Sequence, residues 1–239
     1  SETPLFVSID QEGGNVRRLK APDCPEFAAF PSMRAVGKAN DEELSFNVGE
    51  ITGRQLAALG FNLNFAPVLD VDTNPNNPII NQRAFGRDPE TVARFAIACA
   101  KGLHSAGIVS CGKHFPGHGD TSIDSHLGLP SLPHSRQRLE TIELVPFREA
   151  VKASLPCLMS AHIVFEELDP SLPATLSPTV IPTLLRREMG FQGVLFSDDL
   201  EMAAIKEHFE WPTIAQRGLL ASIDVFLVCR DLLGARLLR

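Results

Sequence analysis

The sequence lacks any apolar run that approaches the roughly 20 residues a membrane-spanning helix needs. It also lacks an excess of positive charge, because 22 lysines and arginines stand against 29 aspartates and glutamates, for a formal net charge of −7. Nucleic-acid binding usually needs a basic face. The composition therefore argues against a membrane-spanning chain and against a nucleic-acid partner, and its 44% hydrophobic and 21% charged residues are typical of a globular protein.

Cysteine is scarce, and its spacing excludes the common paired motifs. The five cysteines are odd in number, contain no CxxC pair and fall mostly in apolar segments: Cys24, Cys99, Cys111, Cys157 and Cys229. This pattern favours buried free thiols over a disulfide framework or a zinc site. Because free thiols are typical of a reducing compartment, and because no signal peptide is visible, we expect a cytoplasmic location.

Short β-rich segments alternate with longer helical patterns along the chain. The strands are predicted at Pro4–Asp10, Phe61–Asp70, Ile108–His114, Cys157–Phe165, Gly193–Asp198 and Ile223–Cys229. The helices are predicted at Glu42–Leu59, Pro89–Ala106, Leu139–Ala153, Val180–Met189, Asp199–Phe209 and Thr213–Ala221. The strand segments are nearly continuous apolar runs, as expected in a parallel sheet that is covered on both faces. Gly60, Gly107 and Gly190 follow three helical patterns, where a helix C-terminal glycine is typical.

Repeated βα units leave two architectures, a closed (βα)₈ barrel and an open doubly wound sheet. The sequence DQEGG at residues 10–14 follows the first strand and contains neither GxGxxG nor a P-loop, which disfavours the open sheet. Polar residues gather where strands end, as in the active site of a barrel. These residues are Asp10, Asp70, Lys113, His114, His162 and Asp198. The α/β class with a TIM (βα)₈-type barrel is therefore favoured.

The strand count falls short of a complete barrel, because six strands are predicted and a barrel needs eight. We therefore expect a single barrel domain over residues 1–239 that lacks the first two βα units. These units would add roughly 50 residues upstream of Ser1. The strands at Pro4–Asp10 and Ile223–Cys229 should then lie on the two sides of a gap.

The segment from Lys113 to His126 has the highest density of reactive side chains. It holds three of the seven histidines, and its proline and glycines predict a loop. Four of its residues could bind a metal: His118, Asp120, Asp124 and His126. A metal site is the weaker interpretation, because Pro116 and Gly117 interrupt the helical spacing that would pair His114 with His118.

A histidine dyad is a better interpretation of the end of this loop. Asp124 and His126 are two residues apart, so their side chains can form a hydrogen bond in a loop. A carboxylate in such a pair fixes the imidazole tautomer and raises its basicity. An imidazole can both donate and accept a proton near neutral pH, which suits general acid/base catalysis.

A second candidate residue ends the predicted strand at Gly193–Asp198. Asp198 would project toward the barrel mouth, where a carboxylate can act as a nucleophile. The adjacent Asp199 is interpreted as a cap or first-turn acid of the following helix. Ser197 lacks the surrounding GxSxG sequence of a serine hydrolase.

Two further polar segments carry a weaker signal. Asp10, a diglycine and the following Arg18 could form a polar clamp for a hydroxyl-rich ligand. Paired structural charges would explain the same residues equally well, and Arg83 is ambiguous for the same reason.

Together these segments resemble the bacterial family 3 β-N-acetylglucosaminidases, including those that recycle muropeptides of the cell wall. The most specific likeness is KHFPGHGDTxxDSH at residues 113–126, followed by SDDLxM at residues 197–202. MSAH at residues 159–162 and PATLS at residues 173–177 also resemble that family. The likeness extends over nearly the whole chain, from the strand of Asp10 to the last strand.

This resemblance implies retaining exo-hydrolysis of terminal β-linked N-acetylglucosamine, without a metal or other cofactor. By position, Asp198 matches the nucleophile, His126 matches the acid/base, and Asp124 matches the residue that orients it. The residues that match those holding the sugar hydroxyls are Asp10, Arg18, Arg83, Lys113 and His114. The β-glucosidases of family 3 instead place a glutamate acid/base on a second domain, so the DSH sequence favours an N-acetylglucosaminide as the carbohydrate substrate.

Two other functions remain open from the sequence. A non-catalytic sugar-binding barrel fragment would use the same polar residues without turnover. A metal-dependent hydrolase would use the histidines and aspartates of residues 113–126 as ligands.

Overall fold

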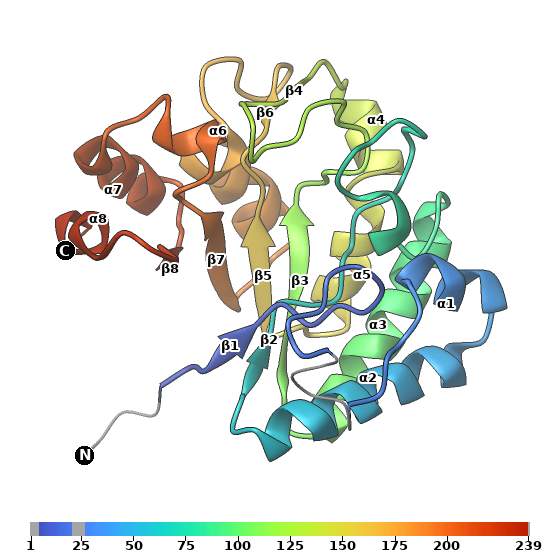
Figure 1. Ribbon diagram of the computed structural model, residues 1–239. Helices are drawn as coiled ribbons and strands as arrows, with labels where there is room; N and C mark the ends of the chain where they lie inside the picture. The colour runs from blue at the N-terminus through green and yellow to red at the C-terminus, as the bar shows by residue number, and fades with distance from the viewer. Residues whose placement is uncertain (1–4, 21–26, 239) are drawn as a thin grey trace.

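The computed structural model describes residues 5–20 and 27–238, and its centre is a six-stranded parallel sheet (Figure 1). The strands run in the order β1-β2-β3-β5-β7-β8. Their bounds are β1 Ser8–Ile9, β2 Leu63–Asn64, β3 Val109–Phe115, β5 Cys157–Ser160, β7 Val194–Asp199 and β8 Val225–Leu227. All six lie at the predicted positions, although β1 and β2 are only two residues long. Pro4, where the first strand was predicted to begin, lies outside the described residues.

The sheet is an open part of a barrel. β1 and β8 are its two edges, and each pairs with one neighbour in the described part of the chain, β2 and β7 respectively. The predicted positions of the first and last strands on opposite sides of a gap are thus confirmed, as is the barrel-type α/β class. The two upstream βα units stay a prediction.

Helices and short strands connect the sheet strands. The remaining elements are α1 Met33–Ala39, α2 Glu42–Ala58, η1 Asn81–Arg83, α3 Pro89–Ser105, β4 Ser131–Leu132, α4 Arg136–Thr141, α5 Val145–Lys152, β6 Val164–Phe165, η2 Ala174–Leu176, η3 Ile181–Glu188, α6 Ala203–Lys206, α7 Trp211–Leu220 and α8 Leu232–Leu237. Helices α1, α2, α3 and α5 lie on one side of the sheet, and α6, α7 and α8 lie beside β7 and β8 (Figure 1). None of the described helices is both long and apolar enough to cross a lipid bilayer.

The long helices begin and end where the sequence predicts. The Asp41 side chain accepts hydrogen bonds from two N–H groups in the first turn of α2, and Asp88 does the same for one N–H of α3. Gly60, Gly107 and Gly190 have φ values of 83°, 81° and 72°, the left-handed conformation that glycine adopts after a helix. The predicted C-terminal glycines are confirmed.

Two helix predictions were wrong. The segment Leu139–Ala153 does not form one helix but divides into α4 and α5, because Pro146 lacks the N–H of a helix interior and fits only a first turn. The segment Asp199–Phe209 contains only the short helix α6. Asp199 is the last residue of β7 and pairs with Leu227 of β8, so its predicted role as a helix cap was also wrong.

Alternate residues of the strands face two different cores. Leu158 of β5 and Leu195 of β7 belong to the larger core, which also contains apolar residues of α3, α5 and η3. Cys111, Cys157 and Phe196 belong to a smaller core together with Leu63, Phe65 and Met159, on the opposite face of the sheet. Because side chains alternate along a strand, this smaller core is the barrel interior.

The thiol prediction is confirmed for the three cysteines Cys99, Cys111 and Cys157, which are free and buried. It is wrong for Cys229, which is free but exposed because it follows β8 at the open edge of the sheet. Cys24 lies outside the described residues.

Candidate active site

The barrel interior continues upward into a polar layer. Phe196 of β7 and Cys111 of β3 face the interior core, and each is followed two residues later by a charged residue, Asp198 and Lys113. Since residues two apart share one face of a strand, both charged side chains lie in the interior at the C-terminal ends of the strands. This is the end at which barrel enzymes build their sites.

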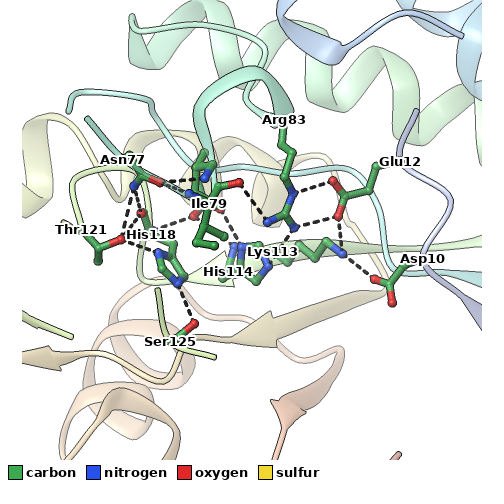
Figure 2. A network of polar contacts seen from close by, with 12 residues as sticks. Asp10, Glu12, Asn77, Ile79, Arg83, Lys113, His114, His118, Thr121 and Ser125 are labelled. Atoms are coloured by element: carbon green, nitrogen blue, oxygen red, sulfur yellow. Dashed lines mark hydrogen bonds and ion pairs between the residues drawn. The ribbon is translucent and has the colours of Figure 1, made fainter. Parts of the chain in front are cut away.

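Lys113 is at the centre of an ion-pair network that comes from separate parts of the chain (Figure 2). Its ammonium lies 2.7 Å from the carboxylates of both Asp10 and Glu12. Glu12 also binds Arg83 through two parallel contacts of 2.8 Å, from Nε and from Nη2. Two cations and two anions are thereby held in a fixed arrangement, because bidentate arginine–carboxylate pairs restrict the geometry.

The segment that carries Glu12 is itself anchored to the sheet. Asn64, the last residue of β2, accepts a hydrogen bond from the Gln11 N–H at 3.0 Å and donates one to the Gln11 carbonyl at 2.9 Å. The Gln11 side chain accepts hydrogen bonds from the N–H groups of Arg18 and Leu19. The chain therefore returns toward the sheet and directs Glu12 into the buried network.

The charges of this network stabilise one another. Burial raises the pKa of Glu12, but the charges of Lys113 and Arg83 outweigh it and hold this pKa far below its ordinary value of 4.5. Burial lowers the pKa of Lys113 and of Arg83, whereas the neighbouring carboxylates raise both above their ordinary values. All three groups are consequently charged near neutral pH.

His114 lies beside this network, and Asp70 orients its imidazole ring. Its Nδ1 lies 2.6 Å from the Asp70 carboxylate, and its Nε2 lies 3.5 Å from Nη2 of Arg83. Burial raises the pKa of Asp70, but the charge and hydrogen bond of His114 lower it below the ordinary value, so Asp70 is ionised. An ionised carboxylate accepts a hydrogen bond from Nδ1–H and leaves Nε2 of His114 directed into the site.

Asp198 is half-buried and yet favours its charged form. Burial raises the pKa of Asp198, and the charges of His114, His162 and Lys113 lower it below its ordinary value. Nε2 of His162 donates to the Asp199 carbonyl at 3.1 Å, and its Nδ1 lies 2.9 Å from the Thr175 hydroxyl. An ionised carboxylate at a strand end, near the charged Lys113, has the chemistry of a nucleophile.

The predicted dyad is formed. His126 Nδ1 lies 2.9 Å from Oδ1 of Asp124, and the same oxygen accepts the His126 backbone N–H at 2.8 Å. The His126 side chain is 63% exposed, so Nε2 is free to meet a ligand. The carboxylate fixes the proton on Nδ1 when the ring is neutral, and protonation of Nε2 yields an acid.

The structure brings together most of the predicted sugar-binding residues. Asp10, Arg83, Lys113 and His114 form one connected network. Arg18 stays at its margin, since its side chain is 65% exposed and its Nη2 lies 3.8 Å from Asp10. A surface pair of this kind contributes little to stability, which leaves Arg18 available to a ligand.

The side chains proposed as metal ligands have other partners. His118 contacts Thr121 and Ser125, and Asp120 contacts Thr73 and Arg138. In the part of the chain that the structure describes, no group of three or more His, Cys, Asp or Glu side chains is arranged to hold a metal ion.

Glu12 is a functional candidate that the sequence interpretation did not select. Its partner Arg83 is 71 residues away, so no local pattern joins them. One signal was present in the sequence, because Glu12 lies two residues after Asp10, within the polar segment that follows the first strand.

Replacing Glu12 with glutamine should lower the free energy of unfolding at pH 7 by on the order of 3 kcal/mol, because Arg83 loses its carboxylate partner and the buried Lys113 loses one of its two. The pKa of Glu12 is lower in the folded state than in the unfolded state. The stabilisation of the fold by ionised Glu12 is therefore fully present above pH 4.5 and decreases as the pH falls below 4.5. Urea unfolding between pH 3 and pH 7 should therefore show a difference between the two proteins that shrinks in acid. The exposed Glu42 provides a control, since Glu42→Gln should change stability by less than about 0.5 kcal/mol. A difference that does not vary with pH would contradict this account.

The chain is similar to known proteins in sequence and in structure. The family model for the glycosyl hydrolase family 3 N terminal domain matches residues 1–235. Beta-hexosaminidase A of Pseudoalteromonas piscicida is 40% identical over 95% of this chain and 40% of its own length. The chain therefore spans less than half of that relative.

Solved structures show the same fold. A family 3 beta-N-acetylglucosaminidase from Paenibacillus sp. str. FPU-7 superposes with a TM-score of 0.94 at 43% identity, over 99% of this chain and 44% of that one. NagZ from Neisseria gonorrhoeae, in complex with N-trifluoroacetyl-D-glucosamine, superposes with a TM-score of 0.84 at 38% identity, over 98% of this chain and 67% of that one.

Proposed function

We propose that this chain, which belongs to glycoside hydrolase family 3, is the catalytic barrel of a retaining β-N-acetylglucosaminidase. The observation that carries the proposal is the Asp124–His126 dyad, with Nδ1 held at 2.9 Å and Nε2 exposed. The ionised Asp198 at the end of β7 adds the second group that such a reaction needs.

In the first step, Asp198 attacks the anomeric carbon of the terminal sugar, and the bond from that carbon to the glycosidic oxygen breaks. The protonated His126 gives its Nε2 proton to the leaving oxygen, while the Asp124 carboxylate accepts a hydrogen bond from Nδ1–H, stabilises the imidazolium and keeps the second proton on Nδ1 of His126. In the second step, His126 takes a proton from water, and the water oxygen displaces Asp198 from the anomeric carbon. Two displacements give retention, as in glycosidases that use two carboxylates.

The buried network orients the sugar for this attack. Asp10 and His114 present acceptors, whereas Lys113 and Arg83 present charged donors, so several hydroxyls can be bound in one pose. Arg18 would contact the substrate from the exposed margin. The complex of the Neisseria relative with an N-acyl glucosamine supports an N-acetylglucosaminide as substrate, and peptidoglycan fragments are the physiological source that we propose.

We further propose that residues 1–239 form one domain and that the protein is cytoplasmic. The match of the family model to residues 1–235 supports the single domain. The buried free thiols of Cys99, Cys111 and Cys157 support a reducing compartment.

The direct test compares hydrolysis of an aryl β-N-acetylglucosaminide with that of the matching aryl β-glucoside. We expect turnover of the first, little turnover of the second, and a β-configured product in the first moments of the reaction, followed by NMR. Hydrolysis of neither glycoside, with retained binding of N-acetylglucosamine, would instead indicate a non-catalytic sugar-binding barrel.

A further inference from the structure

The residue between the two members of the dyad faces the opposite way. Ser125 is 2% exposed, although the adjacent His126 side chain is 63% exposed. The Ser125 hydroxyl lies 3.1 Å from Nε2 of His118, and the Ser125 carbonyl accepts the Ala204 N–H of α6 at 3.2 Å. The loop of the dyad is thus attached to the protein through Ser125 on two sides, of which Figure 2 shows the contact with His118.

Both ring nitrogens of His118 have hydroxyl partners. Nδ1 lies 2.8 Å from the Thr121 hydroxyl, and Nε2 lies 3.1 Å from the Ser125 hydroxyl. Burial, followed by the charge of His114, lowers the pKa of His118 to about 4, so the ring is neutral near pH 7. A neutral imidazole has one donor and one acceptor nitrogen, and a hydroxyl can take either role, so both hydrogen bonds form.

His118 is held rigidly by the sugar-binding side of the site. Its backbone N–H donates to Asp70 at 2.7 Å, and its carbonyl accepts from Asn77 at 2.9 Å. The next residue, Gly119, packs so closely that a Cβ would lie 1.8 Å from the Val71 carbonyl oxygen. Asp70 also orients His114, so one carboxylate fixes both histidines.

We propose that His118 is a positioning residue for the acid/base: through the Ser125 hydroxyl it holds the loop of Asp124 and His126 in place relative to the sugar bound at His114. The proposal rests on the proposed function, because it assigns His118 a role only if His126 protonates the leaving oxygen. A loop tied at residue 125 keeps His126 within reach of that oxygen, and a misplacement of about 1 Å can cost as much as 10²-fold in rate.

The test uses Ser125→Ala, which removes the hydroxyl and leaves the dyad intact. We expect kcat/KM for a substrate with a poor leaving group to fall roughly 10- to 100-fold, because protonation of that oxygen is misaligned. An activated aryl substrate needs little protonation, so its kcat/KM should change less than about threefold. Inhibition by free N-acetylglucosamine, which reports sugar binding, and the Tm should stay close to the wild-type values.

Two substitutions of His118 provide a matched pair. In His118→Gln the side-chain amide can reach the place of Nε2 and keep the bond to Ser125. In His118→Asn the shorter amide stays near the place of Nδ1, keeps the bond to Thr121 and loses the one to Ser125. For the substrate with the poor leaving group, we expect His118→Gln to retain most of the wild-type kcat/KM. We expect His118→Asn to show the same loss of kcat/KM as Ser125→Ala.

A double-mutant cycle with His126→Ala decides whether Ser125 acts through the dyad. If it does, adding Ser125→Ala to His126→Ala should lower kcat/KM on the poor leaving group no further. A full additional loss, or an equal loss on both substrates in the single variant, would overturn the proposal. If His126→Ala itself shows no dependence on the leaving group, the acid/base assignment of the proposed function fails instead.

Discussion

Replacing Asp198 with alanine is expected to reduce turnover of an aryl N-acetylglucosaminide by on the order of 10⁴-fold or more, because the covalent intermediate can no longer form. The physical basis is the ionised state of this carboxylate. Burial opposes its charge, yet His114, His162 and Lys113 lower its pKa below the ordinary value. Asp198 is thus ionised near neutral pH, as a nucleophilic carboxylate must be.

The nucleophile can be identified by trapping. A slow fluorinated N-acetylglucosamine-type substrate should leave a sugar adduct on the peptide that contains Asp198, measured by mass spectrometry. Asp199→Asn is the matched control, since Asp199 is the adjacent carboxylate and accepts the Glu201 N–H at 3.1 Å. This variant should keep far more activity than Asp198→Ala. An adduct on Asp199 or Asp120 would refute the assignment.

The positions of the sheet strands were predictable because burial on both faces leaves continuous apolar runs. Helix α3 was predictable for a different reason, since Asp88, Pro89 and Gly107 are local signals of its two ends. The segment Leu139–Ala153 misled because its apolar spacing is helical throughout, whereas Pro146 restarts the helix. The spacing of apolar residues indicates which face of a helix is buried, but it does not indicate where a helix is interrupted.

The site residues that lie at the end of a predicted strand could be identified from the sequence. Lys113 and Asp198 could be found from strand ends, because a parallel barrel collects those ends on one face. The structural roles of Glu12 and His118 could not be predicted from the sequence. The tertiary structure determines that Glu12 binds Arg83 and that His118 contacts Ser125. Both residues lie within segments that the sequence had already singled out, so the motif was visible while the function of its members was not.

The dyad illustrates the same limit on a smaller scale. The two-residue spacing of Asp124 and His126 predicts their hydrogen bond, and the structure confirms it at 2.9 Å. The same spacing cannot show that Ser125 turns inward toward His118. Local spacing determines which neighbouring side chains can form a hydrogen bond with each other. The packing of the loop on β3 and α6 determines which other residues they contact.

Replacing His126 with alanine is expected to slow the glycosylation step by roughly 10²–10⁴-fold for substrates with poor leaving groups, because their oxygen must be protonated as it departs. For an activated aryl leaving group this step, measured as kcat/KM, should be largely spared. Overall turnover should still fall, since deglycosylation needs His126 to remove a proton from water. Added azide needs no deprotonation to attack, so it should restore turnover of the activated substrate and yield a glycosyl azide.

Asp124→Asn separates the orienting role from the proton transfer itself. Asparagine keeps the size of Asp124 but has no negative charge to stabilise the imidazolium, so glycosylation of poor leaving groups should slow by less than in His126→Ala. Azide should have a smaller effect on this variant, because His126 remains to activate water. If His126→Ala slows kcat/KM equally for all leaving groups and azide restores nothing, the histidine is structural and another residue supplies the proton.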